Sequence, residues 1–154
     1  MSFAERMESW VFKTVNPFMK SLLRSPLHGW MSGSVTILGF RGRKSGREFA
    51  TPLSYVREGG TVFLLSAKTT SWWKNLREDG TPVTLEIARE KLAGKAKLWE
   101  ENNDALRARV HRYLCALPRD AMFYAIKLDE NRQPVEESLA EVAPQLVFVE
   151  ITLD

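Results

Sequence analysis

From residue 34 onward the chain is a series of short segments in which apolar and polar residues alternate, separated by residues that favour turns. The clearest pair covers residues 83–88 and 92–98, where apolar side chains recur at every second position. Successive side chains of a β-strand point to opposite faces, so this alternation predicts two strands that each bury one face. The Arg89-Glu90 turn between them predicts an antiparallel hairpin.

The same patterns predict further strands and short helices along the chain. The Glu58-Gly59-Gly60 turn predicts a hairpin between the strand before it and the strand after it. The other predicted strands are 35–40, 51–56, 61–66, 125–128 and 146–153, and the predicted helices are 71–78, a segment from Asn102 or Asn103 to about Pro118, and 134–142. Six or seven mostly antiparallel strands with flanking helices predict an α+β fold, most simply a small barrel.

Residues 1–24 differ from the rest in having a helical periodicity. Their apolar residues, rich in Trp, Phe and Met, recur at spacings of three and four and so gather on one face, with a break at Pro17. This face either packs on the core, covers a ligand as a lid, or lies on a membrane surface. Because the chain has 154 residues and neither an internal repeat nor a linker, we expect a single domain over 1–154 that includes this amphipathic lid.

Cysteine and histidine are scarce. Cys115 is the single cysteine, so no internal disulfide is expected, and with only His28 and His111 beside it we expect no metal site. No apolar stretch reaches the roughly 18–20 residues that cross a bilayer, and the chain does not begin with a basic region followed by an apolar run. We therefore expect a cytoplasmic protein, with membrane association through residues 1–24 as the alternative.

Positive charge is concentrated in the first third of the chain. Residues 1–47 hold eight lysine and arginine residues against two acidic ones, whereas residues 48–154 hold fourteen against seventeen. An anionic partner is therefore expected to bind the N-terminal third. We do not expect nucleic acid as that partner, because the cations cluster in one short loop instead of forming a long stripe.

This loop lies between the first two predicted strands. It contains Arg41, Arg43, Lys44 and Arg47 within seven residues, and Ser45 adds a hydroxyl donor. Its glycines allow backbone N–H groups to turn toward an anion, which predicts a phosphate-sized site; the alternative is a solvated hairpin tip. It is not a P-loop, because an arginine separates the glycine from the lysine and a strand follows where that motif needs a helix.

Residues 66–76 run from a strand end into a predicted helix and combine hydroxyl residues, a lysine, two adjacent tryptophans and an asparagine. Adjacent helical residues point about 100° apart, so we expect that Trp72 and Trp73 do not both enter one core face and that one of them lines a pocket. Trp72 and Asn75 share a face, which suits a flat heterocycle with polar groups at its edge. Core packing of both indoles is the alternative.

Four segments occur in an order that identifies a family. They are residues 38–46 (LGFRGRKSG), 51–53 (TPL) with Tyr55, 60–68 (GTVFLLSAK) and 72–76 (WWKNL). In this order they resemble the deazaflavin (F420)-dependent nitroreductases, also called F420H2-dependent quinone reductases, within the split β-barrel flavin and deazaflavin oxidoreductases. The resemblance implies a split β-barrel whose cleft holds coenzyme F420, and hydride transfer from the reduced deazaflavin to a quinone or nitroaromatic acceptor. Such a protein orients its cofactor and excludes water, since the cofactor supplies the reactive group.

The resemblance also implies which residues bind the cofactor. These are Arg43, Lys44, Ser45 and Gly46 on the phosphate, with Arg41 and Arg47 adding to the field; Pro52 and Leu53 beside the deazaflavin; Ser66, Ala67 and Lys68 at its ring edge; and Trp72 with Asn75 closing the pocket. Ser54, Tyr55 and Tyr124 are the candidate donors of a proton to the reduced acceptor, and the sequence does not choose among them.

Two alternatives to an F420-dependent reductase stay open. One is an FMN-dependent oxidoreductase on the same fold; F420 carries acidic glutamates beyond its phosphate, so its affinity should fall more steeply with salt than that of FMN. The other is a non-catalytic protein that binds a hydrophobic ligand or docks on a membrane through residues 1–24. We expect either a monomer or a homodimer.

Overall fold

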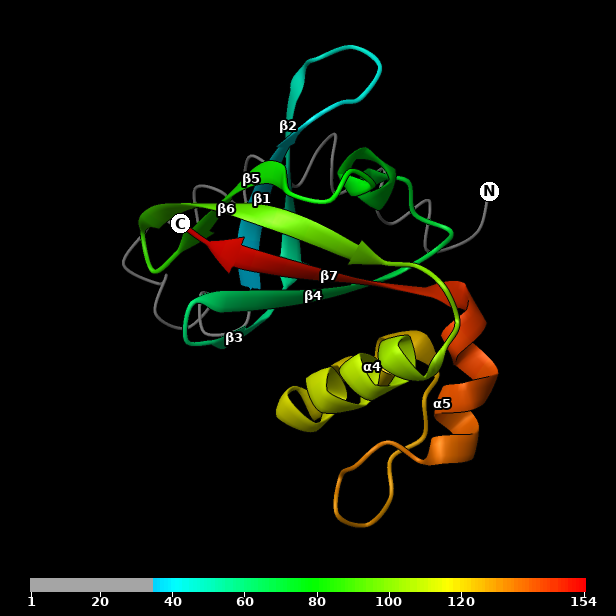
Figure 1. Cartoon of the computed structure of the whole chain (residues 1–154). Helices are drawn as coiled ribbons and strands as arrows, with labels where there is room; N and C mark the ends of the chain where they lie inside the picture. The colour runs from blue at the N-terminus through cyan, green and yellow to red at the C-terminus, as the bar shows by residue number, and fades with distance from the viewer. Residues whose placement is uncertain (1–34) are drawn as a thin grey trace.

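Seven strands form one antiparallel sheet in the computed structural model, which describes residues 35–154 (Figure 1). They are β1 (Val35–Arg41), β2 (Glu48–Ser54), β3 (Val56–Glu58), β4 (Thr61–Ala67), β5 (Thr81–Ile87), β6 (Glu90–Trp99) and β7 (Leu146–Leu153). Each pair of neighbouring strands is antiparallel, as the alternating pattern predicts. The lid predicted for residues 1–24 lies outside the described residues.

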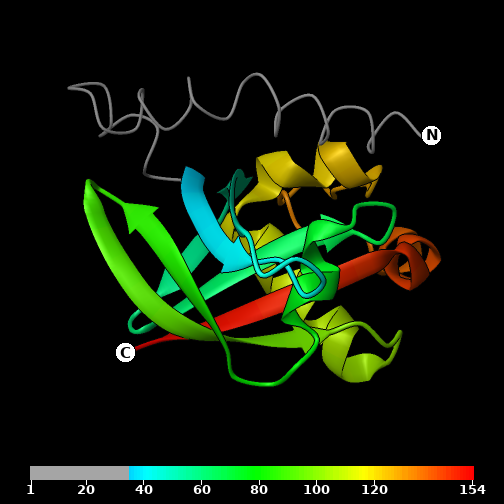
Figure 2. The same ribbon diagram turned by 90° about the horizontal axis from the view of Figure 1, so that it is seen from above.

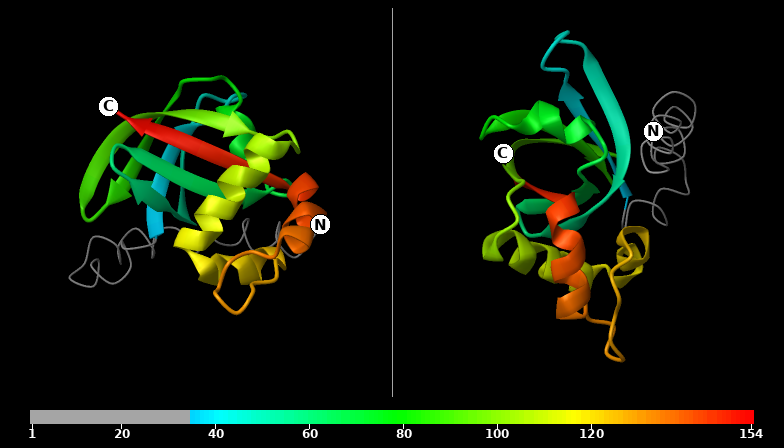
Figure 3. Two further views of the ribbon diagram at one scale, coloured as in Figure 1. Left: turned by 60° about the horizontal axis from the view of Figure 1, so that its bottom comes forward. Right: turned by 90° about the vertical axis from the view of Figure 1, so that its right-hand side faces the viewer.

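The sheet closes because its two outermost strands are consecutive in the chain. The strand order is β2-β1-β5-β6-β7-β4-β3, and only Tyr55 separates the end of β2 at Ser54 from the start of β3 at Val56. Two peptide units connect Ser54 to Val56, so their Cα atoms are at most about 7 Å apart and the two edges of the sheet meet at this point. The sheet therefore curls into a barrel (Figure 3). The predicted α+β barrel of six to seven mostly antiparallel strands with flanking helices is confirmed.

Strand β7 crosses the barrel wall between β6 and β4 and is buried on both faces (Figure 2). Val147, Val149 and Ile151 belong to the core inside the barrel, whereas Leu146 and Phe148 belong to a second core between the sheet and the helices. The sheet thus separates two apolar clusters. The inner cluster also holds Leu38, Phe40, Leu64, Leu85 and both adjacent tryptophans, and the outer one holds Leu106, Val110, Tyr113, Leu114 and Leu139.

The helices pack against the outer side of the sheet. Helix α4 (Asp104–Ala116) and helix α5 (Glu136–Val142) lie together below the barrel in Figure 1. Asn103 caps α4, since its side-chain oxygen accepts a 3.0 Å hydrogen bond from the Leu106 amide, as predicted for a helix that starts there. Three short 3₁₀ helices complete the part of the chain that the structure describes: η2 (Trp72–Leu76), η3 (Pro118–Tyr124) and η4 (Ala143–Gln145).

The predicted strand over 125–128 is wrong. Ala125 has a φ of +56° and ends η3, and the Ile126 amide donates back to the Ala121 carbonyl at 3.0 Å. A single bridge between Leu128 and Pro134 is the one β-pairing of this segment within residues 35–154. The local helical hydrogen bonds therefore replace the ladder that the apolar pattern predicts.

The predicted hairpin around the Gly59-Gly60 turn is only half correct. The segment 51–56 is not one strand: it breaks at Tyr55, so β2 pairs with β1 along its whole length while the short β3 pairs with β4. The hairpin between β5 and β6 is confirmed, although its turn is at Ala88 and Arg89, both with positive φ.

No helix within residues 35–154 is long and apolar enough to span a membrane.

Candidate functional site

The basic loop, residues 41–47, is a tight hairpin end between β1 and β2. At its base Arg41 pairs with Glu48 in the ladder, and their side chains approach to 3.8 Å. The Gly42 amide donates to the Arg47 carbonyl at 2.8 Å, and the Gly46 amide donates to the Gly42 carbonyl at 2.9 Å. Gly46 has a φ of +70°, a backbone conformation that favours glycine. These bonds fix the path of the loop and use the amides of both glycines.

The tip of the loop keeps a set of cationic and hydrogen-bond-donating groups. Arg43, Lys44 and Arg47 are exposed, and within residues 35–154 their side chains form no ion pair. The backbone amides of Lys44 and Ser45 likewise have no acceptor in that part of the chain. Positive side chains around free N–H groups are the chemistry that binds a phosphate. The loop therefore fits the phosphate of a nucleotide-like cofactor.

A hydrogen bond connects the loop to the second predicted site segment. The Arg43 amide donates to Asn75 Oδ1 at 2.9 Å, although 32 positions separate the two residues. Asn75 Nδ2 in turn donates to the Trp72 carbonyl at 2.9 Å, which fixes the orientation of the side-chain amide within η2. The structure thus brings the basic loop and the tryptophan-asparagine segment together.

Both adjacent tryptophans are core residues. Trp72 and Trp73 are each only 3% exposed and belong to the cluster inside the barrel, so the expectation that one of them lines an open pocket is wrong. The Trp72 ring lies 6.5 Å from that of Phe40. The Lys74 ammonium and the Arg77 guanidinium lie over the Trp73 ring, at 5.8 and 5.1 Å from its centroid. These cations cover Trp73, whereas Trp72 packs beside Phe40.

The turn that follows β4 is held by its own hydroxyl groups. Ser66 Oγ accepts a 3.2 Å hydrogen bond from Trp72 Nε1 and lies 2.9 Å from Thr70 Oγ1. Thr70 Oγ1 also donates to the Ala67 carbonyl at 2.7 Å, and the Lys68 amide donates to the Gln145 carbonyl at 2.7 Å. The Ser66 hydroxyl therefore positions the indole, while the side chains of Ala67 and Lys68 are partly exposed.

Strand β2 carries the residues predicted to border a deazaflavin. Pro52 and Leu53 are partly buried, and within residues 35–154 β2 is an edge strand that pairs with β1. Pro52 has no amide hydrogen, so an edge position suits it. At the other end of the strand Phe49 stacks on Phe40, with 5.9 Å between ring centroids. A methyl group added at Gly42 would lie 2.7 Å from Phe49, so this ring fills the space under the loop. The sequence analysis missed this role of Phe49.

The three candidate proton donors differ in their surroundings. Tyr55 is 7% exposed and burial raises its pKa, and burial likewise raises the pKa of Tyr124. The Tyr124 hydroxyl donates to the Leu65 carbonyl at 2.9 Å. Ser54 is partly buried at the end of β2. All three hydroxyl groups are thus protonated at neutral pH. Within residues 35–154, no hydrogen bond joins any of them to the basic loop.

A buried carboxyl group lies near two of these donors, and the sequence analysis missed it. Asp120 is 2% exposed and accepts a 3.0 Å hydrogen bond from the Tyr113 hydroxyl. Burial raises the pKa of Asp120, while hydrogen bonds from Tyr113 and Ser54 and the charge of Arg119 act in the opposite direction. Its charge also contributes to the raised pKa of Tyr124. The position of Asp120 after a proline gave no sequence signal of burial.

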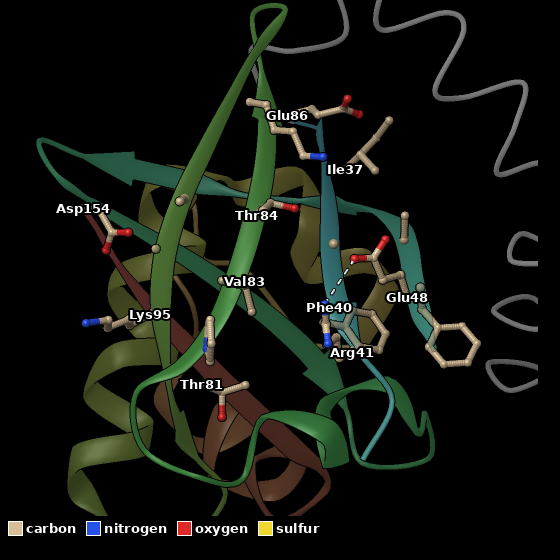
Figure 4. Close-up of a pocket in the computed structure, with 17 residues that line it drawn as sticks. Ile37, Phe40, Arg41, Glu48, Thr81, Val83, Thr84, Glu86, Lys95 and Asp154 are labelled. Carbon is tan, nitrogen blue, oxygen red and sulfur yellow. Dashed lines mark ion pairs between the residues drawn. The ribbon is translucent and has the colours of Figure 1, made fainter. Parts of the chain in front are cut away.

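A cavity of about 620 Å³ opens beside the base of the basic loop (Figure 4). Its lining comes from β1, β2, β5 and β6 and includes the Arg41–Glu48 pair, Gly39 and Thr84. Of the predicted cofactor-binding residues only Arg41 lines it, so the remaining predicted residues lie outside this cavity.

A family model described as F420H(2)-dependent quinone reductase matches residues 18–131, more than half of the chain. The chain belongs to the F420H(2)-dependent quinone reductase family. It is accordingly an oxidoreductase, an F420H2-dependent reductase, and its cofactor is coenzyme F420. The predicted family, cofactor and class of enzyme are confirmed. No curated protein matched the sequence.

Solved structures show the same fold in several flavin-related proteins. A pyridoxamine 5′-phosphate oxidase-like protein from Listeria innocua superposes with a TM-score of 0.51 at 14% identity, covering 91% of this chain and 94% of that one. An FAD-binding protein from Mesorhizobium loti gives 0.52 at 12%, covering 84% and 88%. An F420-H2 dependent reductase gives 0.50 at 18%, covering 79% and 94%. The barrel of this family member is therefore the split β-barrel of flavin-binding proteins, as predicted.

Proposed function

We propose that this protein reduces a quinone with hydride from reduced F420, whose phosphate binds the basic loop. Arg43, Lys44 and Ser45 hold the phosphate, Gly46 gives the loop the positive φ that its turn needs, and Arg41 and Arg47 add to the positive field that attracts the acidic tail. The observation that carries the proposal is the loop tip: three exposed cations and two amides have no partner within residues 35–154. Such a site presents donors and positive charge without an ion pair to break first.

The protein's own residues bind and orient, while reduced F420 supplies the hydride when it is bound. We place Pro52 and Leu53 beside the deazaflavin and Ala67 and Lys68 at its edge, since these partly exposed residues belong to the segments that flank the loop and η2. The hydroxyl groups of Ser54, Tyr55 and Tyr124 remain the candidate donors of the proton that the reduced acceptor takes up. Tyr55 and Tyr124 carry their protons at neutral pH, and burial, which raises both pKa values, makes each a weaker acid than a free phenol.

The quinone is proposed because the family's description names it. A nitroaromatic is the competing acceptor, and both take up hydride and a proton. The distinction is kinetic: we expect kcat/KM for a short-chain quinone to exceed that for a nitroaromatic of similar size.

The experiment that tests this proposal is a parallel titration of the purified protein with F420 and FMN, followed by oxidation of F420H2 in the presence of either acceptor. We expect F420 to bind more tightly than FMN and its affinity to fall more steeply with salt, because its tail adds charges. If F420 does not bind, or if FMN binds more tightly at every salt concentration, the proposed function is wrong. If F420H2 is oxidised faster with the nitroaromatic, the quinone is not the preferred acceptor.

A further inference from the structure

We propose that Asn75 is a positioning residue for the phosphate-binding loop: its side chain holds the loop in one orientation relative to the barrel and does not contact the cofactor ring. This inference rests on the proposed function for its effect on F420, and on the geometry alone for its effect on the loop. It replaces the expectation that Asn75 closes the pocket beside an indole, because that indole is buried.

The loop has few other attachments. The bonds within residues 41–47, and the ladder that begins at Arg41 and Glu48, all belong to the β1–β2 hairpin itself. Within residues 35–154, the Arg43–Asn75 bond is the one hydrogen bond that connects residues 41–47 to an element outside this hairpin. A hairpin end of this kind would otherwise be free to move about its base.

The element that provides this bond is firmly held. Asn75 lies on η2 between buried Trp72 and Trp73 on one side and Leu76, which is fully buried, on the other. The indole N–H groups of the two tryptophans donate to Ser66 Oγ at 3.2 Å and to the Thr70 carbonyl at 2.8 Å. Since Asn75 Nδ2 also donates to the Trp72 carbonyl, its Oδ1 is fixed in direction. The loop is thus connected to the barrel core through one oriented amide oxygen.

The position of this bond along the loop matters for anion binding. It uses the amide of Arg43, and the next two amides, of Lys44 and Ser45, are the ones without an acceptor in the described chain. Fixing the first peptide of the tip sets the starting direction of the two that follow. A loop without this restraint has to be ordered when the anion binds, and that cost in conformational entropy lowers the affinity.

The test compares Asn75→Ala with Asn75→Asp and with Asn103→Ala as a matched control. Asn103 also accepts a hydrogen bond from a backbone amide, but it does so at the start of α4. Two measurements are made on each protein: the hydrogen-exchange rates of the loop amides without cofactor, and the Kd for F420 with the absorption spectrum of the bound cofactor.

We expect Asn75→Ala to speed exchange in residues 42–47 and to weaken F420 binding about three- to tenfold, the size expected for one hydrogen bond. The salt dependence and the bound spectrum should stay unchanged, because no charge and no ring contact is lost. In Asn75→Asp the loop should exchange more slowly than in Asn75→Ala, since the acceptor for Arg43 is retained. Asn103→Ala should leave both measurements on the loop unchanged.

The opposite results would overturn the inference. Unchanged loop exchange in Asn75→Ala together with an altered bound spectrum would make Asn75 a ring contact. Equal exchange in Asn75→Asp and Asn75→Ala would mean that the acceptor does not hold the loop. If the unmodified protein does not bind F420, the proposed function fails, yet the exchange rates still decide whether Asn75 holds the loop.

Discussion

The hydroxyl of Tyr113 on α4 donates a 3.0 Å hydrogen bond to the carboxylate of Asp120 on η3, and each side chain is only 2% exposed. This pair connects the helix to the segment that carries Tyr124. Arg119 Nε lies 3.5 Å from the other carboxylate oxygen and places a positive charge beside it. The consequence is a carboxyl group whose protonation is coupled to folding.

Asp120→Asn should flatten the dependence of stability on pH. Burial raises the folded-state pKa of Asp120 above its usual value of 3.8, so the folded protein binds this proton more tightly than the unfolded chain. The contribution to stability is present below pH 3.8 and is lost as pH rises through the folded-state pKa. At neutral pH the asparagine variant should be as stable as the original protein or more so, because it keeps an acceptor for Tyr113 and carries no buried charge. Urea denaturation at pH 4 to 8 measures this.

The control for that change is Tyr113→Phe, which removes the buried Tyr113 hydroxyl that donates to the carboxylate. We expect it to lower the free energy of unfolding at pH 7 by about 1–3 kcal/mol. A loss of stability in Asp120→Asn at pH 7 that equals the loss in Tyr113→Phe would show that the ionised carboxylate stabilises the fold, contrary to this prediction.

The double change Arg43→Ala with Lys44→Ala should weaken F420 binding about 10- to 100-fold, the range expected when charge-assisted hydrogen bonds are removed. The salt dependence of binding should become shallower. The free energy of unfolding should change by less than about 0.5 kcal/mol, because both side chains are exposed. Lys127→Ala with Arg132→Ala removes two exposed cations elsewhere and serves as the control. Equal affinities of the two double variants for F420 would contradict the phosphate assignment.

Trp72→Ala should act mainly on stability. The indole is 3% exposed, contacts Phe40 and donates to Ser66, so its removal leaves a cavity inside the barrel and should cost about 3–5 kcal/mol. Trp72→Phe keeps most of the packing and should cost less while leaving the Kd for F420 within about twofold. Thermal denaturation and cofactor titration of both variants check this. A stable Trp72→Phe protein with strongly weakened F420 binding would instead make the indole a cofactor contact.

Gly42→Ala should destabilise the protein by about 1 kcal/mol, because the added methyl group would lie 2.7 Å from the edge of the Phe49 ring. Phe49→Leu in the same chain should recover part of this loss, since the smaller side chain makes room. Urea denaturation of both single variants and the double variant gives the coupling. Strictly additive losses would show that the two positions do not meet.

The alternation of apolar residues was enough to predict the hairpin of β5 and β6, since a period of two is present in both strands whatever their other partners are. It could not show that the segment 51–56 divides at Tyr55 between β2 and β3, at opposite ends of the strand order, because this division depends on which strands lie beside each part. The segment 125–128 failed for the opposite reason. Its pattern suits a strand, but Ala125 ends a 3₁₀ helix whose carbonyls accept the local amides.

The site was predictable where it depends on local charge and not where it depends on packing. The cations between Arg41 and Arg47 cluster in the sequence itself. The Arg43–Asn75 bond and the burial of Asp120 result from contacts between different segments of the chain. An asparagine or an aspartate in the sequence does not by itself indicate such a contact. The paired tryptophans were misjudged because helical geometry alone does not include the cations that cover Trp73.

Only Tyr55 links β2 to β3, so the line along which these two strands face each other, here called the seam, is closed at that end. Strands β2 and β3 are the outermost strands of the sheet within residues 35–154, and the chain connects them directly through Tyr55, between Ser54 and Val56. The basic loop lies at the opposite end of β2, roughly 20 Å along the strand at about 3.3 Å per residue. Any widening of the seam therefore hinges at Tyr55 and is greatest near Glu48, so a molecule that entered between the edges would come in from the side of the loop.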